Sequence, residues 1–317
     1  MNITDMKEYT ERIKNNIGTI IIGKQDTIDL LLTAVIAGGH VLLEDTPGTG
    51  KTMLAKALAR SLTADFNRIQ FTPDLLPSDI TGLNVFNQQK STFEFIPGPV
   101  FTNVLLADEI NRATPRTQSS LLECMEEKQV TVDGNTRKLA APFFVIATQN
   151  PVETAGTYPL PEAQLDRFMM QLSMGFPTAE EELQMIERFI AADPLEQMKP
   201  VCSKEDILHM KDAAKTVFVH PAIRQYIIDI IHATRRNPSI ALGVSPRGTL
   251  AFIKAAQVYA AIKGRSFVTP DDVKVLAVPI LSHRLILFSS ISRGSSSTAI
   301  TKGILESVTA PTEEWDK

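Results

Sequence analysis

Short apolar runs separated by amphipathic stretches organise the first half of the chain. Runs bounded by Gly, Pro or polar residues predict buried strands, and the alternation of apolar and polar positions at 66–71 predicts a half-buried one. The predicted strands cover residues 41–43, 66–71, 103–107, 142–148 and 168–172. Helical spacing or strong helix formers predict helices at 5–16, 25–37, 53–59 and 117–127. Apolar strands that alternate with helices predict a five-stranded parallel α/β sheet flanked by helices.

Two short elaborations interrupt this pattern. Residues 83–86 and 92–95 predict the paired strands of an insertion near 83–97, inside a stretch rich in Pro and Gly. Residues 129–139 predict a second hairpin, because Asp133-Gly134 favours a tight turn between the two runs that flank it.

The pattern becomes almost entirely helical beyond Gly175-Phe176-Pro177. Predicted helices cover residues 179–191, 204–217, 221–235, 246–263 and 270–276, and Thr178 is a plausible cap for the first of them. We therefore divide the chain into an α/β core at 1–176 and a smaller all-α domain at 177–317. Residues 294–298, Gly-Ser-Ser-Ser-Thr, predict a flexible connector.

Composition and charge restrict the function classes without selecting one. The 317 residues carry a formal net charge of −4, which gives no global support for nucleic-acid binding. Two cysteines without paired spacing and five scattered histidines argue against a disulfide scaffold and against a zinc or histidine-based metal site. The polar N-terminus differs from a signal peptide, and no apolar run reaches the ~18 residues of a membrane span. We expect a cytoplasmic protein.

The sequence EDTPGTGKT at 44–52 has the context of a phosphate-binding loop, since it follows a predicted strand and opens a predicted helix. Gly48 and Gly50 permit a tight turn that aims backbone N–H groups at phosphate oxygens, and the helix start adds a positive dipole. Lys51 would reach the β and γ phosphates, and the Thr52 hydroxyl would ligate Mg²⁺. The predicted nucleotide contacts of the loop are Pro47, Gly48, Thr49, Gly50, Lys51, Thr52 and Met53. The strict pattern has Gly where this chain has Asp45, and we expect that carboxylate to point away from the phosphates, because its charge would repel them.

A second element of the site is the acidic pair that ends the apolar run at 103–107. Asp108 and Glu109 would lie at the carboxyl end of a buried strand, where open α/β sheets bind ligands. Asp108 would hold Mg²⁺, and Glu109 would orient the water that attacks the γ phosphate. Loop and acidic pair together predict ATP and Mg²⁺ as cofactors, and hydrolysis of ATP to ADP and phosphate as the reaction.

Several longer segments then give a family resemblance. The chain resembles the MoxR family of AAA+ ATPases in ADEINRA at 107–113, TQSSLLE at 117–123, ATQNP at 147–151 and LPEAQLDRF at 160–168. GVSPR at 243–247 and SHR at 282–284 extend the resemblance over nearly the whole chain. It implies an AAA+ core followed by a helical lid domain. The insertion near 83–97 and the hairpin at 129–139 match two elaborations of the clade shared with the ATPase subunit of magnesium chelatase.

The resemblance also implies roles for individual residues. Asn150 matches the first sensor of the γ phosphate, Arg167 the arginine finger and Arg247 the second sensor. Ile22 and Gly23 match the segment that holds adenine.

Partners are implied by the resemblance alone. It implies a homo-oligomer, as a hexameric ring, and a protein client that ATP hydrolysis remodels, matures or loads with a metal cofactor. Proteins with a von Willebrand factor A domain are candidate clients, because the family is often paired with them.

Two other functions stay open, namely a P-loop phosphotransferase that acts on a small molecule and an AAA+ DNA motor. A phosphotransferase needs an acceptor pocket, and it leaves Arg167 and the helical domain unexplained. A DNA motor could use Arg137-Lys138 of the second hairpin to touch phosphates, but the acidic balance and the lack of a basic stripe count against it. Release of phosphate without an acceptor, and stimulation by DNA, are the measurements that separate these functions.

Overall fold

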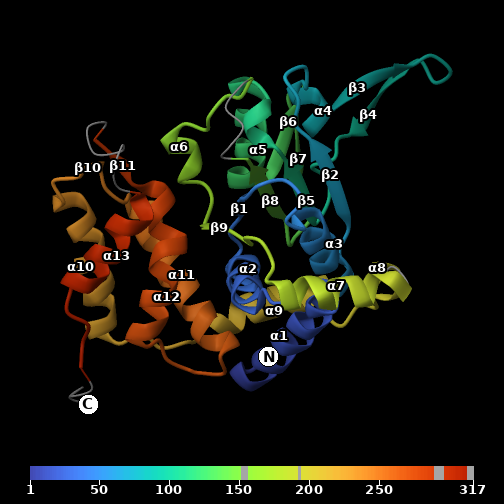
Figure 1. Ribbon diagram of the computed structural model, residues 1–317. Helices are drawn as coiled ribbons and strands as arrows, with labels where there is room; N and C mark the ends of the chain where they lie inside the picture. The colour runs from blue at the N-terminus through green and yellow to red at the C-terminus, as the bar shows by residue number, and fades with distance from the viewer. Residues whose placement is uncertain (151–155, 192–193, 289–295, 313–317) are drawn as a thin grey trace.

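The computed structural model describes residues 1–150, 156–191, 194–288 and 296–312. Its centre is a five-stranded parallel sheet with helices packed around it (Figure 1), which confirms the predicted α/β core. The strand order is β2-β5-β8-β1-β9. The strands are β1 (Val41–Glu44), β2 (Phe66–Gln70), β5 (Val104–Asp108), β8 (Phe144–Gln149) and β9 (Met170–Leu172). Because all pairings are parallel, the carboxyl ends of the strands meet at one edge of the sheet.

Successive residues of the strands pack into two different cores, as the pleat requires. Leu43 of β1 and Leu106 of β5 join a large apolar cluster with the first three helices and most of the later helices. Leu42 and Leu105 point the other way and join a smaller cluster with the helix that follows β5. The central strands are therefore apolar on both faces, which is why their sequences read as continuous apolar runs.

The four helices and two hairpins predicted around the sheet are present and differ from the predictions at their ends, whereas the short helices at 77–81, 110–112 and 162–165 were not predicted. The helices are α1 (Ile3–Gly18), α2 (Gln25–Ala37), α3 (Lys51–Ser61), α4 (Pro77–Thr81), η1 (Ile110–Arg112), α5 (Pro115–Glu127) and α6 (Glu162–Leu165). The insertion forms the antiparallel hairpin β3 (Gly82–Asn87) and β4 (Thr92–Pro97), which projects from the body in Figure 1. The second hairpin, β6 (Gln129–Val132) and β7 (Asn135–Lys138), turns at Asp133 and Gly134 with positive φ angles of 48° and 77°.

The remainder of the chain is mainly helical, as predicted. Its elements are α7 (Ala179–Ala191), α8 (Pro194–Gln197), α9 (Lys204–Ala214), α10 (Pro221–Arg236), β10 (Ile240–Leu242), α11 (Pro246–Ile262), α12 (Pro270–Leu281), η2 (Ser282–Arg284), β11 (Ile286–Leu287) and α13 (Ser297–Ser307). Thr178 caps α7 as predicted, since its hydroxyl accepts from the Glu181 backbone N–H.

The prediction of a flexible connector at 294–298 is wrong for the second half of that segment. Residues 294 and 295 lie outside the described residues, but Ser297 and Thr298 form the first turn of α13. Ser296 caps that helix by accepting a hydrogen bond from the Ala299 backbone N–H at 3.2 Å. A Ser-rich stretch suits a flexible connector and a helix cap equally well, so composition alone could not separate the two.

Candidate active site

The loop between β1 and α3 has the backbone of a phosphate cradle. Gly48 and Gly50 have φ angles of 86° and 89°, a left-handed conformation that favours glycine, and Gly50 caps α3. A Cβ built at Gly48 would meet nothing within 4 Å, so the loop is open on that side. Lys51 Nζ donates to the backbone oxygens of Asp45 at 2.8 Å and Thr46 at 3.4 Å, which holds the ammonium over the loop.

Asp45 lies at the base of this loop, and its carboxylate is turned away from it. It accepts hydrogen bonds from the Ser173 hydroxyl at 2.7 Å and from the backbone N–H groups of Met174 at 2.7 Å and Gly175 at 3.1 Å. The side chain is buried, so its charge is held by these donors rather than by solvent. Asp45 therefore ties the start of the loop to the segment that leaves β9.

The acidic pair lies at the end of β5, and Thr148 of the neighbouring strand β8 bridges it. The Thr148 hydroxyl donates to Asp108 Oδ1 at 2.6 Å and accepts from the Glu109 backbone N–H at 2.8 Å. Glu109 itself is left-handed, with φ 56° and ψ 48°. That conformation costs a non-glycine residue about 1–2 kcal/mol, and such strain gathers at functional positions.

Three further polar side chains contact the acidic pair, and the sequence assigned none of them this position. Arg68 of β2 donates to Asp108 Oδ2 at 2.7 Å, and Gln70 of β2 donates to Glu109 Oε2 at 2.7 Å. Arg112 pairs with Glu109 Oε2 at 3.0 Å. The alternation at 66–71 places Arg68 and Gln70 on one face of β2, and this signal could have identified them as neighbours of the β5 carboxylates.

Asn150 and the Ile22-Gly23 segment occupy two further positions near the loop. Asn150 is buried and directly follows β8, next to the strand that ends in the phosphate loop. Gly23 has a φ of 73°, and a Cβ there would lie 1.6 Å from Glu181 Oε1 of α7. The segment predicted to hold adenine thus packs directly against the start of α7.

The donor set at the carboxyl edge suits a magnesium nucleotide. Gly48 and Gly50 open the cradle, Lys51 supplies a cation, and Thr52 and Asp108 offer a hydroxyl and a carboxylate. Mg²⁺ takes few protein ligands and completes its shell with phosphate oxygens and water. Groups from three adjacent strand ends, those of β1, β8 and β5, are therefore chemically matched to ATP with Mg²⁺.

Arg167 and Arg247 lie together, but at the other edge of the sheet. Arg167 lies shortly before β9. The Met169 backbone N–H donates to the His40 backbone oxygen at 2.8 Å, and these two residues directly precede β9 and β1. This hydrogen bond therefore marks the amino ends of both strands. Arg167 Nη1 lies 3.0 Å from Glu126 Oε2, and Arg247 Nη2 bonds Glu126 Oε1. In one chain, therefore, both arginines are on the far side of the sheet from Lys51.

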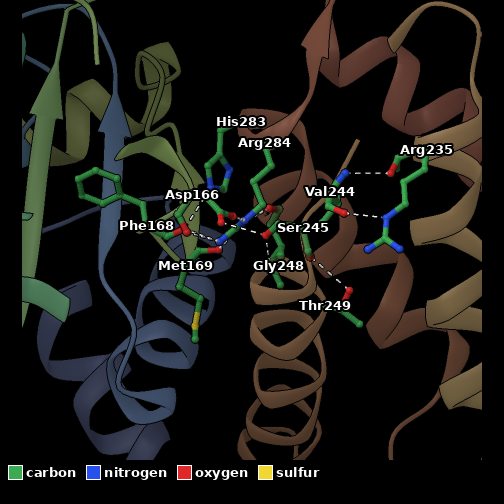
Figure 2. Close-up of polar contacts among 12 residues, drawn as sticks. Asp166, Phe168, Met169, Arg235, Val244, Ser245, Gly248, Thr249, His283 and Arg284 are labelled. Carbon is green, nitrogen blue, oxygen red and sulfur yellow. Dashed lines mark hydrogen bonds and ion pairs between the residues drawn. The ribbon is translucent and has the colours of Figure 1, made fainter. Parts of the chain in front are cut away.

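A buried network joins the segment of Arg167 to the later helices (Figure 2). Arg284 donates to Asp166 Oδ1 at 2.7 Å, to the Phe168 backbone oxygen at 2.6 Å and to the Met169 backbone oxygen at 3.2 Å. Ser245, two residues before Arg247, donates to Asp166 Oδ2 at 2.9 Å. Arg284 thus fixes the backbone on both sides of Arg167, and Asp166 links this segment to the start of α11 through Ser245.

Two histidines in the same region are buried and neutral. His40 Nε2 contacts the Met125 backbone oxygen at 3.1 Å, and its Nδ1 accepts from the Val145 backbone N–H at 3.0 Å. Burial lowers the pKa of His40 to about 4. The pKa of His283 is also far below its usual value, because the ring is buried and lies beside Arg284.

Comparisons with known proteins agree on one family. Residues 40–170 match the ATPase family associated with various cellular activities (AAA), and residues 232–303 match the AAA lid domain. The chain is 40% identical to Chaperone MoxR1 of Mycobacterium tuberculosis over 95% of this chain and 82% of that one. It is 31% identical to Protein MoxR of Methylorubrum extorquens over 98% of this chain and 97% of that one.

A solved structure extends the agreement to three dimensions. The crystal structure of a candidate ATPase from Cytophaga hutchinsonii superposes with a TM-score of 0.91 at 39% identity, over 98% of this chain and 97% of that one. Among the described residues, every helix is too short or too polar to cross a membrane. The predicted AAA+ core with a helical lid is confirmed, and the chain belongs to the MoxR family of AAA+ ATPases.

Proposed function

We propose that the protein is a Mg²⁺-dependent ATPase that assembles into a ring and completes each ATP site across a subunit boundary. The observation that carries this proposal is the separation of the two arginines from the phosphate loop. Lys51, Asp108 and Glu109 lie at the carboxyl edge of the sheet, whereas Arg167 and Arg247 share Glu126 at the amino edge. Two arginines held at the far edge can reach a γ phosphate only in another copy of the chain.

Each half of such a site has its own task. Lys51 neutralises the β and γ phosphates, Thr52 and Asp108 hold Mg²⁺, and Asn150 contacts the γ phosphate or the water. Glu109 orients the attacking water, for which it must leave or share its contacts with Gln70 and Arg112. A Mg²⁺ ion held by Thr52 and Asp108 would offset the negative charge of the phosphates.

The arginines supply the remaining charge from the neighbour. A guanidinium is always protonated, and a positioned one stabilises the negative charge that develops on the γ phosphate. Arginine fingers of this kind contribute roughly 10³–10⁵ in rate. An isolated subunit is therefore expected to hydrolyse ATP slowly.

The rest of the proposal concerns organisation and partners. Residues 1–176 form the nucleotide-binding core and residues 177–317 the lid, a division that accommodates the family matches at 40–170 and 232–303. The ring is a hexamer, and Ile22 and Gly23 hold adenine. The client is a protein that hydrolysis remodels or matures, which the name of Chaperone MoxR1 supports for that relative. Loading of a metal cofactor and a von Willebrand factor A domain client belong to the same proposal.

Mixing two inactive variants tests the shared site. Lys51→Ala removes the loop cation and Arg167→Ala removes the finger. A ring made of either variant alone therefore contains no complete site. In an equal mixture, about a quarter of the head-to-tail interfaces join a native loop to a native finger. Recovery of phosphate release in the mixture supports the proposal. A mixture as inactive as its components, from variants shown to co-assemble, contradicts it.

A further inference from the structure

Helix α7 presents its apolar face to solvent. Leu183, Ile186 and Ile190 recur at i, i+3 and i+7, so they form one stripe along the helix. Their side chains are 58%, 57% and 78% exposed, and neither apolar core of the described residues includes them. Met185 and Phe189 widen the stripe and are also exposed. A surface helix normally buries such a face, so this one lacks its partner in a single subunit.

The polar face of α7, by contrast, holds the helix to its own chain. Arg188 Nη1 donates to the backbone oxygens of Gly18 at 2.8 Å and Thr19 at 3.0 Å, at the C-terminal end of α1. Glu181 lies 3.8 Å from the Lys24 ammonium, which also donates to the Phe176 backbone oxygen at 3.0 Å. These contacts orient the apolar stripe outward, so its exposure follows from a defined arrangement.

A matching surface lies beside the two arginines at the other edge of the sheet. A cavity of about 520 Å³ runs between the end of α2, the end of α5 and the start of α11. Its apolar lining includes Met125, Pro246, Leu250 and Ala251, and Leu250 is 60% exposed. Arg167 and Arg247 line the same cavity, which we name the arginine groove.

The two surfaces carry opposite unpaired charges. Lys128 and Lys254 line the arginine groove and, with Lys211, an adjoining cavity of about 220 Å³, and none of the three forms an ion pair with a described residue. Burial and the neighbouring lysines Lys128 and Lys254 lower the pKa of Lys211. On α7, Glu182 and Glu187 beside the apolar stripe likewise have no ion-pair partner in the described part of the chain.

We propose that α7 of one subunit docks in the arginine groove of the next subunit. The inference rests on the proposed function, because a neighbour that brings Arg167 to the phosphate loop also brings the groove that Arg167 lines. The start of α7 is near that loop, since a Cβ at Gly50 would lie 3.8 Å from Met174, five residues before the helix. In Figure 1, α7 extends away from the lid helices α10 to α13, so the contact joins two different surfaces. Such head-to-tail contacts build rings.

Charge reversal tests the pairing of the two surfaces. Glu182→Lys with Glu187→Lys, or Lys128→Glu with Lys254→Glu, places like charges across the contact. Each double variant should raise the concentration for half-assembly about tenfold or more, as facing like charges do at other interfaces. We would measure this by sedimentation velocity with a non-hydrolysable ATP analogue. A chain that carries all four changes has opposite charges again and should assemble within about threefold of the native chain.

A control reverses one charge of each sign elsewhere on the surface. Glu11→Lys with Lys302→Glu alters exposed residues of α1 and α13 and should leave assembly unchanged. A four-change chain that assembles no better than either double variant would overturn the inference.

Cross-linking locates the contact without relying on catalysis. Chains with Ile186→Cys, mixed with chains carrying Leu250→Cys, should form a disulfide-linked dimer under mild oxidant. The native cysteines, Cys124 and Cys202, should not form disulfides, because both are buried and burial raises the pKa of each thiol to about 12. Phe93→Cys on the β3–β4 hairpin, 72% exposed, replaces Ile186→Cys as the control.

The outcomes separate this inference from the proposed function. If Lys51→Ala and Arg167→Ala complement each other but the α7 cross-link stays at the level of the control, the shared site stands and α7 docks elsewhere. A disulfide formed within a single chain that carries both cysteines assigns the groove to its own α7 and overturns the inference.

Discussion

The buried Arg284 forms an ion pair with the partly buried Asp166 across the junction between core and lid, with Arg284 Nε 2.7 Å from Asp166 Oδ1. The same guanidinium donates to the backbone oxygens of Phe168 and Met169, so it holds the two residues that follow Arg167 in place. Ser245 binds the second oxygen of Asp166. Two arginines proposed to act on one nucleotide come from distant parts of the sequence, and this network keeps Arg167 and Arg247 in one arrangement.

Replacing Arg284 should destabilise the fold. Arg284→Ala removes the cation beside the Asp166 carboxylate and the donor to four backbone oxygens, and breaking a buried pair from one side costs up to about 3–5 kcal/mol. Arg284→Lys should be intermediate, since one ammonium cannot reach all of these acceptors in the geometry of a guanidinium. Urea unfolding measures both.

The matched control for that experiment is Arg12→Ala. Arg12 is an exposed residue of α1 whose pair with Glu8 spans one helical turn, and its loss should change stability by about 0.5 kcal/mol or less. An Arg284→Ala protein as stable as the Arg12→Ala control would show that the network does not hold the junction.

The phosphate loop and the acidic pair should separate binding from hydrolysis. Lys51→Ala should lose most ATP affinity, because it removes the cation that faces the β and γ phosphates. Glu109→Gln should bind ATP and hydrolyse it on the order of 10²-fold more slowly or worse, because the amide orients and polarises water poorly. Calorimetry and phosphate release measure the two effects, with Lys56→Ala on the same helix as the control. Native turnover by Glu109→Gln would refute the assigned role.

The sequence predicts those parts of the fold and the site that depend on local signals. The strands, the loop and the acidic pair were predictable because each depends on a local period or on a motif within a few residues. The contact of Arg68 with Asp108 joins residues 40 apart, and that of Arg284 with Asp166 joins residues 118 apart. The alternation at 66–71 gives the face of β2 on which Arg68 lies, but the pairing of β2 with β5 is needed to identify Asp108 as its partner. Arg284 carries no local signal of its partner, since an arginine after a helix is ordinarily solvated. The edge of the sheet on which Arg167 lies likewise emerges only once the strand order is known.

Asp45 should matter for stability more than for the nucleotide. Its carboxylate accepts three hydrogen bonds from residues 173–175, and Asp45→Gly removes all of them. A loss of at least about 2 kcal/mol in the free energy of unfolding is expected, given that a single bond to a charged group already contributes about 1.5–3 kcal/mol. ATP affinity should stay within about tenfold, or about 1.4 kcal/mol. Asp45→Asn, which keeps an acceptor, serves as the control. A much larger loss of affinity with unchanged stability would place the carboxylate at the nucleotide.

Acid should destabilise the protein through His40. Its folded pKa of about 4 lies below the unfolded value of 6.5, so the unfolded chain binds the proton more tightly. The stability that neutral His40 contributes is complete above pH ~6.5 and falls as the pH drops towards about 4, by up to about 3 kcal/mol. His40→Gln should flatten this part of the curve of unfolding free energy against pH. An equal slope in the variant would assign the acid sensitivity to other groups.

Arg247 should act on the neighbour's nucleotide together with Arg167, because both contact Glu126. A mixture of Arg167→Ala with Arg247→Ala chains distinguishes this from action within one subunit. If both arginines face the neighbour, every interface in the mixture lacks one of them, and phosphate release stays as low as in the pure variants.

If Arg247 instead acts in its own subunit, an Arg167→Ala chain keeps a native loop and a native Arg247. It then receives a native Arg167 from an Arg247→Ala neighbour. About a quarter of the interfaces would then be complete, and activity would recover. The mixture of Arg247→Ala with Lys51→Ala is the positive control, since it restores complete interfaces only when Arg247 acts across the boundary. Recovery in the first mixture and none in the second would place Arg247 in the site of its own subunit.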